Sequence, residues 1–119
     1  MDKVNFIHTE DGTDIILSLS FDGDTEFGID GFTIIRTPKF EFALMPHERG
    51  ACVSWDEKTD VIEIIKEINC KDNELTVVSN LRSYQFDISR LSNDETDHLW
   101  KTIDRMNFDG TIRIIRRSK

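Results

Sequence analysis

The chain has 119 residues, of which 38% are hydrophobic and 32% charged, and its net charge at pH 7 is −8. This length and composition indicate one folded domain, residues 1–119, and exclude an intrinsically disordered chain. The excess of acidic residues repels phosphate groups, so we expect no nucleic-acid binding.

The N-terminal stretch MDKVNFIHTEDG has no basic region followed by an apolar block, so it does not resemble a secretion signal. Apolar runs elsewhere are too short for a membrane helix. The two cysteines, Cys52 and Cys70, lack CxxC spacing and are typical of buried thiols in a reducing compartment. We therefore expect a cytoplasmic protein without membrane association.

The first predicted element is a β-hairpin, VNFIHTEDGTDIILSLSF, with Asp11-Gly12 as a two-residue turn. That turn predicts one apolar face made of three cross-strand pairs: His8 with Ile15, Phe6 with Leu17, and Val4 with Leu19. A shift of one residue would scatter the apolar set, so the pattern favours this register.

Residues 22–31, DGDTEFGIDG, form an expected acidic loop. An EF-hand is excluded because Phe27 and Thr33 occupy the positions that need Gly and a bidentate acid, and a weak surface calcium site on these carboxylates is the alternative. Alternation then predicts strands at 32–36, 39–45 and 51–55, with Pro38 interrupting the first two because proline cannot donate to a sheet.

The second half of the chain is more regular. VIEIIKEINCKDNELTVVS predicts a hairpin that turns at Asp72-Asn73, and SYQFDIS a further strand. The period changes in LSNDETDHLWKTIDRMNF to that of a helix, where Ser92 and Glu95 form a capping box. TIRIIRR predicts a last strand with Ile112 and Ile114 inward.

This order predicts an α+β fold: mostly antiparallel β structure, about eight or nine strands in hairpins, with one C-terminal helix packed on the sheet. A partly closed barrel plugged by the helix is the alternative.

The stretch MPHERGACVSWDE carries the best candidate for chemistry, because His47, Glu48, Arg49 and Cys52 lie close together in sequence. Its Pro and Gly indicate a hairpin tip, which by itself supplies neither the burial nor the fixed neighbour that a catalytic group needs. The three histidines lack metal-ligand spacing, and no glycine-rich loop joins a strand to a helix. We therefore expect no metal, no cofactor and no enzymatic activity, with a small hydrolase-like enzyme at the His47–Cys52 hairpin as the alternative.

The remaining distinctive feature is a concentration of carboxylates near the N-terminus. Such a surface fits a basic protein partner, because charge complementarity speeds association and fixes orientation. The predicted partner-binding residues are Asp11, Asp14, Asp22, Asp24, Glu26 and Asp30. A structural or adaptor subunit that self-associates by a strand edge is a third hypothesis.

In size, acidity and the order of its elements the chain resembles the small immunity proteins of bacterial polymorphic-toxin and contact-dependent inhibition systems. The resemblance rests on EFGIDGFTIIRTPKFEF, the β-rich body that follows, and the late helix LSNDETDHLWKTI. It implies binding to a cognate toxin domain, often a nuclease, whose cationic active site would be blocked. That group shares no diagnostic residues, so the resemblance assigns no role to individual positions.

Overall fold

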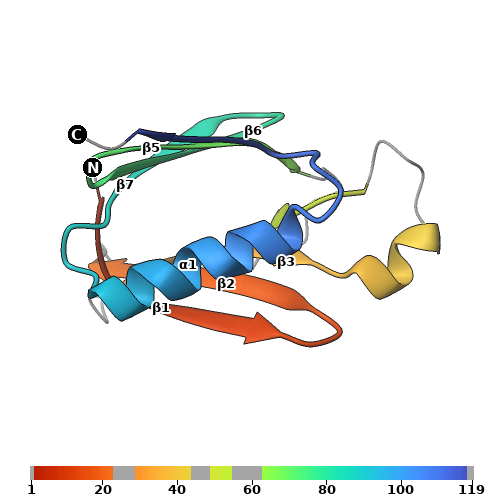
Figure 1. The fold of residues 1–119 in the computed structure, drawn as a ribbon, viewed down its shortest axis with the longest axis horizontal. Helices are drawn as coiled ribbons and strands as arrows, with labels where there is room; N and C mark the ends of the chain where they lie inside the picture. The colour runs from red at the N-terminus through yellow and green to blue at the C-terminus, as the bar shows by residue number, and fades with distance from the viewer. Residues whose placement is uncertain (1, 23–28, 44–48, 55–62, 118–119) are drawn as a thin grey trace.

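The computed structural model describes residues 2–22, 29–43, 49–54 and 63–117. These residues form eight strands and one α-helix, shown in Figure 1. The strands are β1 (Asp2–Asp11), β2 (Ile15–Asp22), β3 (Ile29–Arg36), β4 (Cys52–Ser54), β5 (Ile65–Lys71), β6 (Glu74–Ser79), β7 (Ser83–Asp87) and β8 (Arg113–Arg117). The helix is α1 (Asn93–Met106), and a 3₁₀ helix, η1 (Pro38–Ala43), follows β3.

The strands form one mixed sheet in the order β4-β3-β2-β1-β7-β6-β5-β8. The expected α+β fold, rich in antiparallel pairing and with one late helix, is confirmed. Two pairings are parallel, β1 with β7 and β5 with β8. The second arises because α1 carries the chain back across the sheet before β8, and parallel strands require such a crossover.

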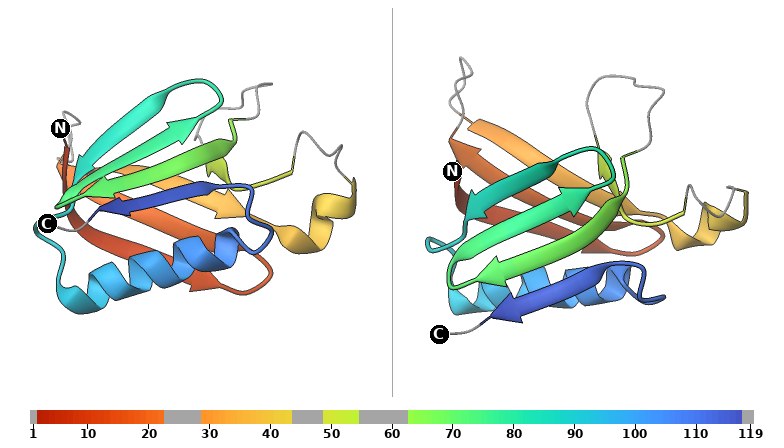
Figure 2. Two further views of the ribbon diagram at one scale, coloured as in Figure 1. Left: turned by 45° about the horizontal axis from the view of Figure 1, so that its top comes forward. Right: turned by 90° about the horizontal axis from the view of Figure 1, so that it is seen from above.

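The sheet is folded into two leaves, which face each other in Figures 1 and 2. The first leaf contains β1 to β4 and the second contains β5 to β8. Between β1 and β7 only Asp2 with Phe86 and Lys3 with Asp87 pair. The leaves are joined a second time where Cys52 of β4 forms an antiparallel bridge with Ile64, just before β5. Helix α1 packs on β1 and β2. The hydrophobic core therefore lies between the leaves and beneath the helix.

Aromatic side chains connect the two leaves within this core. Phe86 of the second leaf lies 5.1 Å from Phe32 and 5.8 Å from Phe21, measured between ring centroids. Phe32 also lies 4.6 Å from the ring of Tyr84. Tilted rings at these separations are favourable beyond their burial, so this cluster stabilises the contact between leaves.

Helix α1 matches its sequence signals. The Ser92 hydroxyl accepts a hydrogen bond from the Glu95 backbone N–H, and the Glu95 carboxylate accepts one from the Ser92 N–H. These bonds satisfy two of the donors that a helix N-terminus leaves free, so the predicted capping box is confirmed. The apolar face is buried as expected, with Leu99, Ile103 and Met106 in the core.

The first hairpin has a different register from the predicted one. Asp11 pairs with Ile15 around a three-residue turn, and the strands continue with Thr9 opposite Leu17. A bulge between Val4 and Phe6 adds a second shift. The prediction that Phe6 and His8 face the core is therefore wrong: both are exposed, because the longer turn reverses the facing of β1 while β2 keeps its buried set.

The prediction of a strand at residues 39–45, after β3, is also wrong. Residues Pro38–Ala43 are a 3₁₀ helix instead. Pro38 supplies no N–H to a ladder, and Glu41 reaches back to form an ion pair with Arg36. Contact between positions five residues apart requires a compact turn and excludes an extended strand.

The second hairpin has the predicted register, with Lys71 opposite Glu74 and Cys70 opposite Leu75. Asp72 in its turn has a φ of 56°, a left-handed conformation that aspartate tolerates better than most residues. In the last strand region, Ile112 is buried and Ile114 packs against the core. Both cysteines are free thiols, as expected.

Candidate protein-binding surface

The acidic residues predicted to bind a partner lie at two places along β2. Asp11 and Asp14 flank the β1–β2 turn, whereas Asp22 ends β2 and Asp30 pairs with Phe21 in the adjacent strand. The length of β2 separates the two groups by about 23 Å at the usual rise of a strand. Asp24 and Glu26 lie outside the described residues. The described positions therefore form two acidic groups, one at each end of β2.

The group at the β1–β2 turn also contributes to the fold. Asp11 forms an ion pair with Arg105, in the last turn of α1. Asp14 accepts a hydrogen bond of 2.6 Å from the Thr37 hydroxyl. These contacts attach the turn to the helix and to the end of β3, so both carboxylates have a structural role besides any role in binding.

Between the two acidic groups lies the side of the first leaf that faces away from α1, which we call the outer strand face. Cross-strand register assigns its members, since residues directly opposite in an antiparallel pair share a face. They are Phe6, His8, Glu10, Ile16, Ser18, Ser20, Thr33, Ile35 and Cys52. By the same rule Asp11, opposite the buried Ile15, and Asp30, opposite the buried Phe21, hold inward positions at the ends of the strands, whereas the position of Asp22 continues the outward alternation of Ser18 and Ser20. The middle of this face is uncharged: the Ser18 and Thr33 hydroxyls form a hydrogen bond of 3.0 Å, and Phe6 is 49% exposed beside Ser20.

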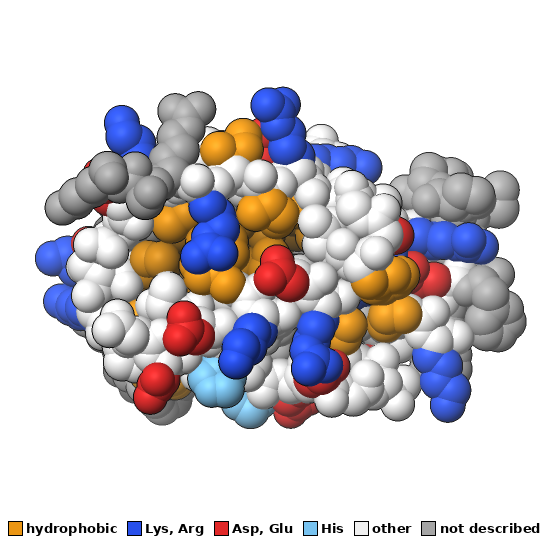
Figure 3. All heavy atoms as spheres, in the orientation of Figure 1, with side chains coloured by type: hydrophobic (Ala, Val, Ile, Leu, Met, Phe, Trp, Pro, Cys, Tyr) orange, Lys and Arg blue, Asp and Glu red, His pale blue; other side chains and the backbone are white. Residues whose placement is uncertain are grey.

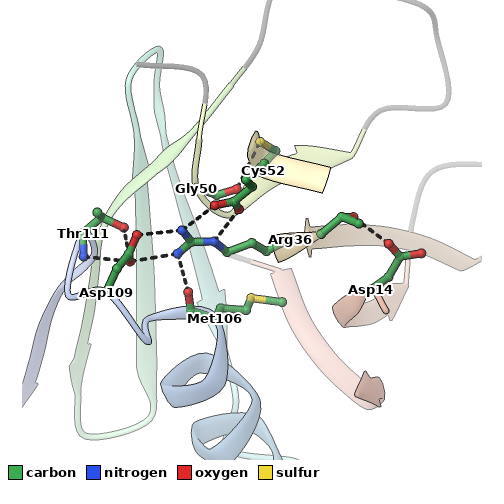
Figure 4. A network of polar contacts seen from close by, with 9 residues as sticks. Asp14, Arg36, Gly50, Cys52, Met106, Asp109 and Thr111 are labelled. Carbon is green, nitrogen blue, oxygen red and sulfur yellow. Dashed lines mark hydrogen bonds and ion pairs between the residues drawn. The ribbon is translucent and has the colours of Figure 1, made fainter. Parts of the chain in front are cut away.

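Among the described residues, a buried arginine is the centre of an extensive polar network, seen from close by in Figure 4. Arg36 is 2% exposed and lies on the inward side of β3. Its guanidinium makes two hydrogen bonds with Glu41, at 2.7 and 3.0 Å, and two with Asp109, at 2.7 and 2.9 Å. A fifth, at 2.6 Å, goes to the backbone carbonyl of Met106, and the ring of Phe108 lies 4.2 Å from the guanidinium carbon.

All five guanidinium donors of Arg36 are thus used within the protein, so none remains for a ligand. Burial lowers the pKa of Arg36, but the hydrogen bonds that it donates to Asp109 and Glu41 outweigh this effect and raise the pKa overall. The hydrogen bonds from Arg36 hold the pKa of Asp109 well below its ordinary value. The network joins β3, η1 and the end of α1. The inward alternation of Phe32 and Ile34 also places Arg36 inward, but no local pattern in the sequence indicates the carboxylates that it binds.

A second buried network surrounds Glu63. Its carboxylate accepts hydrogen bonds of 2.6 Å from the hydroxyls of Ser79 and Tyr84, and it lies 3.6 Å from the Arg82 guanidinium. The pKa of Tyr84 is raised, mainly by burial and also by the hydrogen bond that its hydroxyl donates to Glu63. The network joins the start of β5 to β6 and β7, which is a structural role.

The candidate catalytic hairpin is described only in part, because His47 and Glu48 lie outside the described residues. Arg49 is exposed, and the Cys52 thiol donates to the Gly50 carbonyl at 3.5 Å. Burial and the nearby Glu41 raise the pKa of Cys52, which lowers its thiolate population, whereas a nucleophilic cysteine needs the opposite shift. Within the described ranges, no group of three His, Cys, Asp or Glu side chains could hold a metal ion.

The two outermost strands of the described sheet are β4 and β8. β4 has three residues, and β8 contains Arg113, Arg116 and Arg117. The other side of β4 is already bonded, because the Val53 N–H donates to the Glu63 carbonyl and the Ile65 N–H donates to the Ala51 carbonyl. β8 is basic, so two copies of this strand would repel each other. The described edges therefore do not favour self-association by strand pairing.

Comparison of the chain with protein-family models, with curated proteins and with solved structures found no match. None of the described residues forms a helix with the length and hydrophobicity that crossing a membrane requires.

Proposed function

We propose that this protein is a non-enzymatic binding protein that docks to a basic protein partner through the outer strand face. The observation that carries the proposal is the layout of that face, with an uncharged middle containing the half-exposed Phe6, with Glu10 and Asp14 toward one end and with Asp22 at the other. Interface centres are depleted of charge, whereas charges at the rim steer association and fix orientation.

The chemistry of the described residues supports a binding role over a catalytic one. The buried cation Arg36 donates all five of its guanidinium hydrogen bonds to groups of the protein itself. Burial raises the pKa of both thiols, so neither is activated as a nucleophile. The acidic groups, in contrast, belong to a chain with a net charge of −8 that favours a cationic partner.

As a more specific proposal, the protein is an immunity protein that binds a cognate toxin domain and blocks its basic active site, with a nuclease as the expected class. Support comes from the small acidic domain and from the two-ended acidic face, which matches a cleft lined by basic residues. Asp22, at an outward position of β2, is the proposed anchor at one end, and Asp30, opposite the inward Phe21, is proposed to contribute from the border of that end. Asp11 and Asp14 are the supporting residues at the other, and Asp24 and Glu26 are proposed to extend the first group.

The test is binding to the protein encoded next to this one, measured by isothermal titration calorimetry. A Glu10→Lys/Asp22→Lys variant reverses one charge at each end of the face, and Phe6→Ser removes its apolar side chain. An Asp97→Lys/Asp104→Lys variant on the exposed side of α1 gives the same change in net charge as a control. We expect at least tenfold weaker binding for the face variants and a much smaller change for the control. Equal affinities of the face and control variants would refute the proposed surface.

A further inference from the structure

A groove of about 810 Å³ lies between the first half of α1, the β5–β6 turn, the segment after β7 and the end of β8. Its lining includes the mostly buried apolar side chains of Cys70, Ile88, Leu91 and Trp100. In Figure 3, hydrophobic side chains gather in a hollow between α1 and the strands above it, and a basic side chain lies over them. The size is within the range of sites that bind small molecules.

One side of the groove is formed by Arg116, near the end of β8. Ile112 is buried and Ile114 packs against the core, and Arg116 occupies the next position on the same side of β8, opposite the buried Cys70 but itself exposed. A pattern that builds only a core would place a large apolar residue there. Instead, the Arg116 guanidinium carbon lies 4.2 Å from the centre of the Trp100 ring, and the small Cys70 leaves space beneath it.

Arg116 also differs from other described arginines in its electrostatic partners. Arg36, Arg105 and Arg113 each form an ion pair with a carboxylate. Among the described residues, Arg116 forms none and is held by its contact with Trp100. A cation over an aromatic ring keeps its hydrogen-bond donors directed outward, since the contact uses the flat side of the guanidinium.

The rest of the lining is consistent with one negative charge on a ligand. Asn93 and Thr96, in the first turn of α1, border the groove, where the helix dipole favours an anion. Asp72, on the exposed β5–β6 turn, contributes an opposing charge. The groove therefore suits a singly charged acid better than a phosphate or a polyanion.

We propose that this groove binds a small organic molecule with an apolar body and one carboxylate. The carboxylate accepts hydrogen bonds from the Arg116 guanidinium, and the apolar body covers Ile88 and Leu91 and lies beside Trp100. This site is separate from the outer strand face, so its existence does not depend on the proposed protein partner.

Two probe pairs test the proposal, one linear and one aromatic: octanoate with 1-octanol, and 4-phenylbutyrate with 4-phenylbutanol. Calorimetry measures affinity, and alkylation by the neutral reagent iodoacetamide, followed by mass spectrometry, reports the site through Cys70. We expect at least one carboxylate to bind about tenfold or more tightly than its matched alcohol, because a charge-assisted hydrogen bond to arginine is lost in the alcohol. Bound carboxylate should slow alkylation of Cys70 and leave that of Cys52 unchanged.

Arg116→Met keeps an unbranched side chain without charge, and Arg113→Met on the outward side of the same strand is the matched control. The first variant should reduce the preference for carboxylate over alcohol to less than about threefold, and the second should retain it. Arg116→Gln provides the same comparison if the methionine variant does not fold. The proposal is overturned if neither carboxylate binds saturably up to about 1 mM, if Arg116→Met or Arg116→Gln retains the preference, or if Cys70 is not protected.

Discussion

Replacing Arg36 with methionine tests whether the buried network stabilises the fold. The substitution retains a long unbranched side chain but removes five hydrogen bonds, four of them to carboxylates and one to the Met106 carbonyl. It leaves two carboxylates without their cation in a site from which solvent is partly excluded. Glu41 is the more buried of the two, with a side chain 13% exposed, whereas the Asp109 side chain is 35% exposed.

The expected loss in the free energy of unfolding follows from this geometry. Removing one partner of a buried ion pair typically costs about 3–5 kcal/mol. Solvent screens the Asp109 side of the network, so we expect a value near the lower limit, about 3 kcal/mol in the free energy of unfolding. In a domain of this size that corresponds to a decrease in melting temperature of roughly 10 °C.

Urea unfolding followed by circular dichroism measures this loss. Arg113→Met is the control, because its ion pair with Glu67 spans 3.8 Å at an exposed site and should change stability by less than about 0.5 kcal/mol. Arg36→Met/Glu41→Leu should recover part of the loss, since it also removes one of the stranded carboxylates. A loss below about 1 kcal/mol for Arg36→Met, or no recovery in the double variant, would refute the structural role assigned to the network.

Three further predictions concern the helix cap, the response to acid and the thiols. Ser92→Ala removes the capping box with Glu95 and should reduce the free energy of unfolding by about 1 kcal/mol in urea titrations, whereas no loss would contradict the cap. Folding lowers the pKa of Asp109, so the ionised carboxylate adds to the free energy of unfolding at pH values above its pKa in the unfolded chain. This stabilisation is lost as the pH falls toward the pKa in the folded protein. The stability advantage of the native protein over Asp109→Asn should therefore be largest above about pH 4 and decrease below it in urea titrations at several pH values, and a pH-independent difference would contradict this. Burial raises the pKa of Cys52 and of Cys70, so at pH 8 both should react about tenfold more slowly with a thiol reagent than in urea, and equal rates would show that they are not protected.

The parts of the fold that the sequence predicts correctly are those set by local chemistry. Ser92 and Glu95 are three residues apart, and Asp72-Asn73 is a tight turn between strands whose alternation agrees with it. Each signal is complete within one segment, and no distant group competes with it. The helix and the second hairpin therefore follow from the sequence with little ambiguity.

The first hairpin and the segment after Pro38 were mispredicted because distant residues decide them. Asp11-Gly12 favours a two-residue turn locally, but packing against α1 selects a three-residue turn and a bulge that direct Ile7 toward the core. Similarly, Phe40 and Phe42 alternate as in a strand, yet the ion pair between Glu41 and Arg36 holds this segment as a 3₁₀ helix. Local propensity yields where tertiary contacts contribute more free energy.

The candidate sites depend even more on tertiary structure. The sequence by itself determined an acidic α+β domain, the capped helix and the inward alternation of the last strand, because these depend on composition and on spacings within single segments. Only the folded chain placed Asp11 and Asp30 near opposite ends of β2, and brought Arg36 to Asp109 and Arg116 to Trp100. The physical reason is that side-chain pairing between distant segments depends on strand register and helix packing, which no local spacing specifies.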